Sequence, residues 1–201
     1  LCRGETGEWT AFDPIDTVRI QEAAGSSEPI VILEAMGGGS FTIEDNGTLR
    51  GVLMTEPVFS SDTETAVSSG TVNVSPTGKW TYYDPLIAAA REGDESSGLE
   101  QGQSNLAGYA GSGTLKSTVA GKLYGFLSAS SGTTVDVTIN KGGVWSWKDP
   151  DDTVSSLDTF PGNTGLQPLL MAAPGSTVKA TIDGQATGDM LMVATMMSTT
   201  S

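Results

Sequence analysis

The acidic stretch DPDDT places Asp149, Asp151 and Asp152 within four residues, and DPIDT repeats the pattern with Asp13 and Asp16. Paired carboxylates can serve as general acid and base in glycoside hydrolysis, and clustered carboxylates bind Ca²⁺. Because both stretches occupy the same place in an internal repeat, we interpret their aspartates as turn caps rather than catalytic groups. An irregular calcium site at Asp149, Asp151 and Asp152 stays open as an alternative, and no other cofactor is expected.

The side chains that perform most nucleophilic and metal chemistry are missing from this chain. It contains no histidine and a single cysteine, Cys2. This composition excludes Ser-His and Cys-His nucleophile pairs, His-containing zinc sites and a thiolate zinc cluster. The Gly-Lys-Ser/Thr signature of a phosphate-binding loop is also absent from the sequence. We therefore predict that the protein is not an enzyme.

Two pairs of aromatic residues form a possible ligand platform. Trp80 and Tyr82 are two residues apart, as are Trp145 and Trp147, so each pair faces one side of a regular strand. Rings exposed in this way could stack on a sugar. Since aromatic residues make up only 6% of the chain, we favour the interpretation that these rings belong to the core.

A motif of the form Gly-x-Trp-(Ser/Thr)-x-x-Asp-Pro occurs three times, as GEWTAFDP, GKWTYYDP and GVWSWKDP. It places Trp9, Trp80 and Trp145 at intervals of 71 and 65 residues. Two further landmarks follow each motif in the same order: a Gly-Ser pair, and then a Gly-x-x-x-Gly segment that reads GTLRGVLM, GKLYGFLS or GQATGDML. This constant order indicates an internal repeat of about 65–70 residues, in which the three tryptophans are core residues.

Each repeat predicts strands that end at fixed turns. Segments such as TVNVSPTGKWTYY alternate branched apolar with polar residues, which is typical of a half-buried strand. The Asp-Pro pair after each segment favours a turn, because Pro excludes the helical conformation from the preceding residue and Asp caps the turn. A helix pattern is confined to residues 84–94 and, more weakly, 15–25. The predicted turn pairs are Asp13–Pro14, Asp84–Pro85 and Asp149–Pro150.

These elements predict an all-β protein made of tandem β-sandwich units, either immunoglobulin-like or jelly-roll-like. Residues 1–38 would form a partial N-terminal repeat or arm that contains a strand. Residues 39–110 would form a first sandwich unit with an acidic loop at 91–105, and residues 111–201 a second one. The N-terminal strand would either close the sheet of its own chain or complete the sheet of another copy.

The charge of the chain restricts its partners. Ten Lys and Arg residues face 24 Asp and Glu residues, which gives a net charge of −14. Such a surface repels nucleic-acid phosphates and anionic lipid head groups, so we expect neither a nucleic-acid nor a membrane partner. A negative surface keeps a protein soluble and can complement a basic protein surface.

The stretch GKLYGFLSASSGTTVDVTINKGGVWSWKDP, followed by APGSTVKATIDG, resembles the small β-sandwich domains of tailed-phage virions, such as capsid decoration proteins. The resemblance lies mainly in residues 111–201. It implies a non-enzymatic virion structural protein, namely a capsid decoration or cement protein on the virion surface. Such a protein would form a homo-oligomer and contact the major capsid protein or other virion proteins. The alternative is a secreted, extracellular carbohydrate- or receptor-binding β-sandwich module that uses the aromatic pairs.

Overall fold

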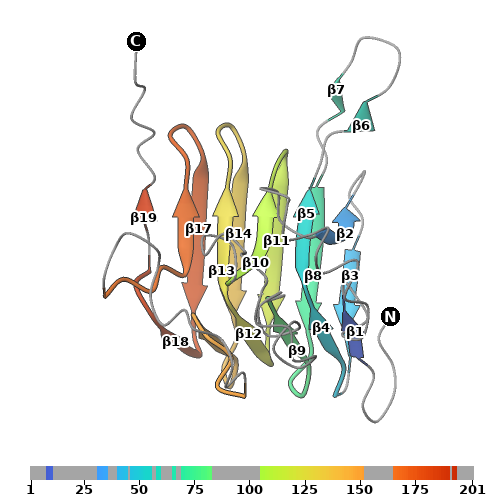
Figure 1. Ribbon diagram of the computed structural model, residues 1–201, viewed down its shortest axis with the longest axis vertical. Coiled ribbons are helices and arrows are strands. Elements are labelled where there is room, and N and C mark those ends of the chain that lie inside the picture. Colours follow the sequence, from blue (N-terminus) through green and yellow to red (C-terminus); the bar gives the residue numbers. More distant parts are fainter. Residues whose placement is uncertain are drawn as a thin grey trace, which may run out of the picture.

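The structure is a computed structural model of the 201-residue chain. It contains strands and turns throughout the described part, and no helix occurs there. Figure 1 shows the strands side by side, from β1–β3 at one end of the row to β17–β19 at the other. The described residues are 8–10, 31–35, 40–44, 46–55, 58–59, 65–66, 69–82, 105–151, 165–190 and 192–193.

Three parallel sheets make up most of the described structure. We name them A, B and C after the recurring order in which the chain passes from one to the next. Sheet A contains β3 (Ser40–Ile43), β8 (Ser69–Val74), β11 (Thr114–Val119), β14 (Thr134–Ile139) and β17 (Thr177–Ile182). Sheet B contains β1 (Glu8–Thr10), β4 (Thr48–Arg50), β9 (Lys79–Thr81), β12 (Lys122–Tyr124), β15 (Val144–Ser146) and β18 (Gln185–Thr187). Sheet C contains β2 (Val31–Ala35), β5 (Val52–Thr55), β10 (Leu106–Ala110), β13 (Phe126–Ala129), β16 (Leu170–Ala172) and β19 (Met192–Val193).

The chain visits the sheets in the fixed order A, B, C and then returns to A, next to the strand it left. We call one such circuit a coil; β11–β12–β13 is an example. Each strand pairs in parallel with the equivalent strands of the coils before and after it, as β11 does with β8 and β14. The fold is therefore a parallel β-solenoid, in which neighbouring coils lie about 4.8 Å apart. A small antiparallel hairpin, β6 (Val58–Phe59) and β7 (Thr65–Ala66), interrupts the path between sheets C and A.

Columns of identical or similar apolar side chains fill the interior of the solenoid. In sheet A, Val74, Val119 and Ile139 lie opposite one another in successive coils, and all three are buried. The period-2 alternation of the strands produces this column, because every second side chain points inward. Full burial of each such side chain contributes roughly 1.5–3 kcal/mol to the free energy of unfolding.

The prediction of tandem β-sandwich units is wrong, because the three large sheets are parallel and belong to one solenoid. Alternation of apolar and polar residues is the same for a sandwich strand and a solenoid strand, so the pattern could not distinguish the two folds. Strands from 39–110 and 111–201 are neighbours in all three sheets. Within residues 1–38, β1 and β2 pair with β4 and β5 of the same chain. The fold implied by the resemblance to virion β-sandwich domains is therefore not the one found.

The repeat of 65–71 residues corresponds to two coils rather than to one structural unit. One continuous column of sheet B contains a tryptophan in alternate coils and a smaller apolar residue between them. The Gly-Ser pair of each repeat precedes the coil that lacks tryptophan, and the Gly-x-x-x-Gly segment spans its sheet B strand. In order, the column is Trp9, Leu49, Trp80, Leu123, Trp145 and Ala186.

Candidate functional site

The long connections of the solenoid share one edge, the line along which the chain leaves sheet B for sheet C. In three alternate coils the path from sheet B to sheet C takes many residues, namely 11–30, 82–105 and 147–169. Since the strands that flank these segments are stacked in sheets B and C, the three connections begin and end along this single line, which we call the B–C edge. Successive starting points are two coils, or about 10 Å, apart.

The coils between them cross the B–C edge by a different route. Gly51 and Gly125 are each the single residue between a sheet B strand and a sheet C strand. Gly125 has a φ of 106°, and a Cβ atom there would lie 2.4 Å from the backbone oxygen of Asn105. Both the backbone conformation and the lack of space therefore require glycine at this corner.

The glycine corners also supply acceptors for the tryptophans. Trp80 Nε1 donates to the backbone oxygen of Gly51 at 3.3 Å, and Trp145 Nε1 donates to that of Gly125 at 2.9 Å. Both rings are fully buried, and a buried indole N–H needs such a partner. In the first two Gly-x-x-x-Gly segments, the second glycine therefore accepts a hydrogen bond from the tryptophan of the next coil.

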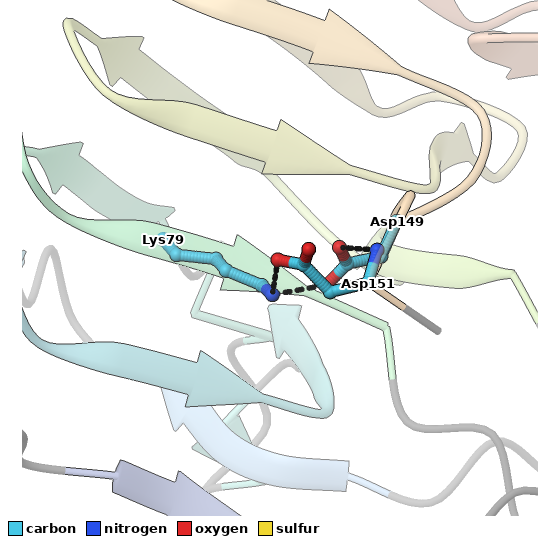
Figure 2. Close-up of polar contacts among 3 residues, drawn as sticks. All are labelled: Lys79, Asp149 and Asp151. Atoms are coloured by element: carbon cyan, nitrogen blue, oxygen red, sulfur yellow. Dashed lines mark hydrogen bonds and ion pairs between the residues drawn. The ribbon is translucent and has the colours of Figure 1, made fainter. Parts of the chain in front are cut away.

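A buried ion pair fixes the start of the third long connection to the outer face of sheet B. Lys79 Nζ lies 2.5 Å from Asp149 Oδ2 and 3.4 Å from Asp151 Oδ2, and Figure 2 shows both carboxylates on the ammonium group. The Asp149 side chain is fully buried, that of Lys79 is 18% exposed and that of Asp151 is 74% exposed. Lys79 belongs to β9 and Asp149 follows β15, so the pair spans the intervening strand β12.

Tyr124 on that intervening strand lies next to the ion pair. Lys79 Nζ is 5.6 Å from the centre of its ring, which is within range of a cation–π interaction. Burial, followed by the negative charges of Asp149 and Asp151, raises the pKa of Tyr124 from 10.0 to about 12. The phenol therefore stays neutral at physiological pH.

Further contacts fix the same connection from the side of sheet C. The ring of Trp147 stacks on that of Phe126 with 5.5 Å between centroids and 15° between planes. Asn105 Nδ2 donates to the Trp147 backbone oxygen at 3.1 Å. Because Asn105 precedes β10 and Trp147 follows β15, the end of the second long connection is bonded to the start of the third.

Asp149 also has the capping role that its Asp-Pro motif predicts. Its Oδ1 accepts a hydrogen bond from the backbone N–H of Asp151 at 3.1 Å, and so closes a turn over Pro150. The other carboxylate oxygen of Asp149, Oδ2, is the one that pairs with Lys79. Asp152 lies outside the described residues, and within the described part no group of three or more His, Cys, Asp or Glu side chains could hold a metal ion.

The remaining residues singled out in the sequence lie in two places. Trp80 and Trp145 are in the core, and Tyr82 and Trp147 are also buried, so neither aromatic pair presents a ring to a sugar. Trp9 lies opposite Leu49 in sheet B. The predicted turn residues Asp13, Pro14, Asp84 and Pro85 lie outside the described residues, as do the two helix patterns at 15–25 and 84–94.

Sequence reasoning missed Lys79, Tyr124 and Asn105. The only signal for Lys79 is a basic residue beside a core tryptophan in a chain with few basic residues. Its partner Asp149 follows β15. The pairing could be found only from the register of the solenoid, which places β9 and β15 two coils apart.

Comparison of the chain with protein-family models, curated proteins and solved structures finds no match. None of the described residues forms a helix long and apolar enough to cross a membrane.

Proposed function

We propose that this chain is a non-enzymatic structural and binding protein of a virion surface. In this role the solenoid is a rigid scaffold, and the B–C edge contacts a basic surface of another virion protein, such as the capsid shell. The observation that carries the proposal is the position of the three long connections. They start and end along one line of the scaffold, at a spacing of two coils.

The scaffold part of the proposal follows from the packing. Parallel strands joined coil to coil, with a continuous apolar interior, give a body in which each coil is held by its neighbours. Long loops carried by such a framework are the usual place for binding residues. The Asn105–Trp147 hydrogen bond and the ion pair of Lys79 with Asp149 hold the end of the second connection and the start of the third.

The partner part follows from the distribution of charge. The segments 11–30, 82–105 and 147–169 contain 13 of the 24 acidic residues of the chain but only three of its ten basic ones. Negative charge concentrated in connections that start and end at one edge attracts a basic partner, directs its approach and repels acidic surfaces. The sheet faces carry a more balanced charge, as in the column that alternates Lys116, Asp136 and Lys179.

Co-sedimentation with virions from the genome that encodes the chain tests this function. The chain should pellet with the particles, and the variant E92Q/D94N/E95Q/E100Q in the second long connection should bind at least tenfold more weakly. The matched control E56Q/D62N/E64Q/D136N changes the net charge by the same amount, but only at sheet A and between sheets C and A. Absence of any co-sedimentation would overturn the virion assignment, and equal weakening of both variants would overturn the role of the B–C edge.

The alternative of a carbohydrate-binding module required exposed aromatic pairs. The rings of Trp80, Tyr82, Trp145 and Trp147 are all buried, so no observation favours that alternative.

A further inference from the structure

The ion pair at the start of the third long connection brings an amine and a buried carboxyl group together. Lys79 Nζ lies 2.5 Å from Asp149 Oδ2, and Figure 2 shows the ammonium group directed at this carboxylate and at that of Asp151. The Asp149 side chain is fully buried. Apart from Lys79, its Oδ2 has no polar partner within the described residues. An amine and a carboxyl group are the two halves of an amide bond.

The two oxygens of Asp149 are held in different ways. Oδ1 accepts a hydrogen bond from the backbone N–H of Asp151 at 3.1 Å, whereas Oδ2 faces the ammonium group. A backbone N–H in this position stabilises negative charge that develops on Oδ1. The same residue supplies a further group, because Lys79 Nζ donates a hydrogen bond to Asp151 Oδ2 at 3.4 Å. Since the Asp151 side chain is 74% exposed, it can also exchange protons with solvent.

We propose that Lys79 and Asp149 condense to an intramolecular amide bond, an isopeptide, with Asp151 as the proton carrier. The bond would link β9 covalently to the segment that follows β15, across the intervening strand β12. Before the reaction the ion pair holds the start of the third connection, and after it the amide does. This inference does not depend on the proposed function.

The condensation balances within these three side chains. Asp151 accepts one proton from the Lys79 ammonium group and passes it to Asp149 Oδ2, which leaves a neutral amine beside a carboxylic acid. Nζ then bonds to Cγ of Asp149, and negative charge moves to Oδ1. A second proton passes from Nζ through Asp151 to Oδ2, the Cγ–Oδ2 bond breaks, and Oδ2 leaves as water. The third ammonium proton stays on the amide nitrogen, and no oxidant, reductant or cofactor is needed.

Proximity and burial both favour the amide over the ion pair. Groups held in a reactive orientation behave as if they were present at about 10⁵–10⁸ M. The amide is neutral, so its formation also removes the cost of keeping two opposite charges largely out of water. The Tyr124 ring lies beside the ammonium group, 5.6 Å from Nζ. The raised pKa of its phenol keeps it protonated, so it does not take the proton that Asp151 accepts.

The sequence offers this combination at one of the three tryptophan motifs. The residue before the tryptophan is Glu8, Lys79 or Val144, so only the second motif supplies an amine. A different set of Lys and Asp neighbours occurs in sheet A, where Asp136 lies opposite Lys116 and Lys179. Both of those lysines are exposed, which makes this set a suitable comparison for the buried one.

The mass of the intact full chain tests this inference without a virion or any partner. The folded wild-type protein should be lighter than its sequence mass by one water molecule. Lys79→Arg keeps the positive charge but removes the nucleophilic amine, so it should have the full sequence mass. Lys122→Arg is the matched control and should keep the loss, because Lys122 is exposed and lies opposite Lys79 in sheet B. Fragmentation of a proteolytic digest should show a branched peptide that joins Lys79 to Asp149.

A time course with freshly synthesised protein tests the proton carrier. Asp151→Asn should slow the appearance of the lighter mass roughly 10²-fold, whereas Asp136→Asn should leave the rate unchanged. A wild-type chain that keeps its full sequence mass after prolonged incubation in the folded state would overturn the inference. So would a loss of water that persists in Lys79→Arg, because it would then arise elsewhere in the chain. An unchanged rate in Asp151→Asn would overturn the role of that residue.

Discussion

The coils β11–β12–β13 and β14–β15–β16 pack directly on each other, yet they differ at two linked positions. The first places Leu123 in the sheet B column and crosses the B–C edge by Gly125 alone. The second places Trp145 in that column and crosses the edge by residues 147–169. The Trp145 N–H bonds to the Gly125 backbone oxygen. The two kinds of coil are therefore complementary, because the short coils with Gly51 and Gly125 provide the acceptors that Trp80 and Trp145 require.

Replacing the tryptophan tests this complementarity with the largest expected effect. Trp145→Ala should lower the free energy of unfolding by about 4 kcal/mol, because it removes a fully buried ring. Trp145→Leu, which copies the neighbouring coil, should still cost about 2 kcal/mol because of the lost ring contacts and the unpaired Gly125 oxygen. Urea unfolding measures both values. A cost for Trp145→Leu near zero would mean that the two kinds of coil are interchangeable.

Removing the ammonium group at the start of the third connection should have the next largest effect. Lys79→Met leaves the Asp149 carboxylate buried without its counter-charge, which should cost about 3 kcal/mol. The double variant K79M/D149N should recover part of this loss, since it removes both charges. Lys122→Met is the matched control, because Lys122 is exposed and lies opposite Lys79 in sheet B. Chemical denaturation of the wild-type chain and these three variants measures the losses of stability. Equal losses in Lys79→Met and Lys122→Met would contradict the ion-pair role.

The glycine corner of the short coil gives a smaller effect. Gly125→Ala should cost about 2 kcal/mol, because it combines a positive φ with a clash against the Asn105 oxygen. Gly132→Ala has a positive φ of 77° and no atom within 4 Å of the added Cβ, so it should cost only about 1 kcal/mol. The difference between the two thermal or urea midpoints isolates the steric part, and equal midpoints would contradict the tight corner.

The smallest expected effect is the pH dependence that Tyr124 contributes. Its pKa in the folded chain is about 12, against 10.0 for the ordinary group. The folded state therefore holds this proton more tightly than the unfolded state, and the resulting stability is present below pH 10 and lost between pH 10 and pH 12. At pH 11 the loss is about 1.4 kcal/mol. Tyr124→Phe should lack this pH-dependent loss of stability. The free energies of unfolding of the wild-type chain and of Tyr124→Phe, each at pH 8 and pH 11, measure the loss as the difference between the two proteins.

The sequence alone predicted strands and three recurring landmarks, but not how the strands are arranged. Val135, Val137 and Ile139 alternate with polar residues as they would in a sandwich strand, and alternation does not distinguish parallel from antiparallel pairing. The sequence pattern predicts one unit per repeat, because Leu49 and Leu123 occupy the tryptophan column but do not resemble tryptophan. Only the register of the sheets shows that each repeat contains two coils.

The candidate site was harder to predict than the strands. The aspartate of the third Asp-Pro pair was identified as a turn residue from its local sequence, because a carboxylate that caps a turn acts on its near neighbours. Its pairing with Lys79 depends on two strands that are distant in sequence and two coils apart in space. Interactions of this kind follow from topology, which neither composition nor local spacing determines.

The hydrogen bonds from Trp80 and Trp145 to the glycines of their preceding coils restrict how this molecule could change in length during evolution. Deletion of a single coil would leave an indole N–H facing a corner without its glycine, or two glycine corners in succession. Removal or duplication of a pair of coils preserves every donor and acceptor. Viable length variants should therefore differ by whole pairs, in increments of about 10 Å, and each added pair would bring one further long connection to the same edge.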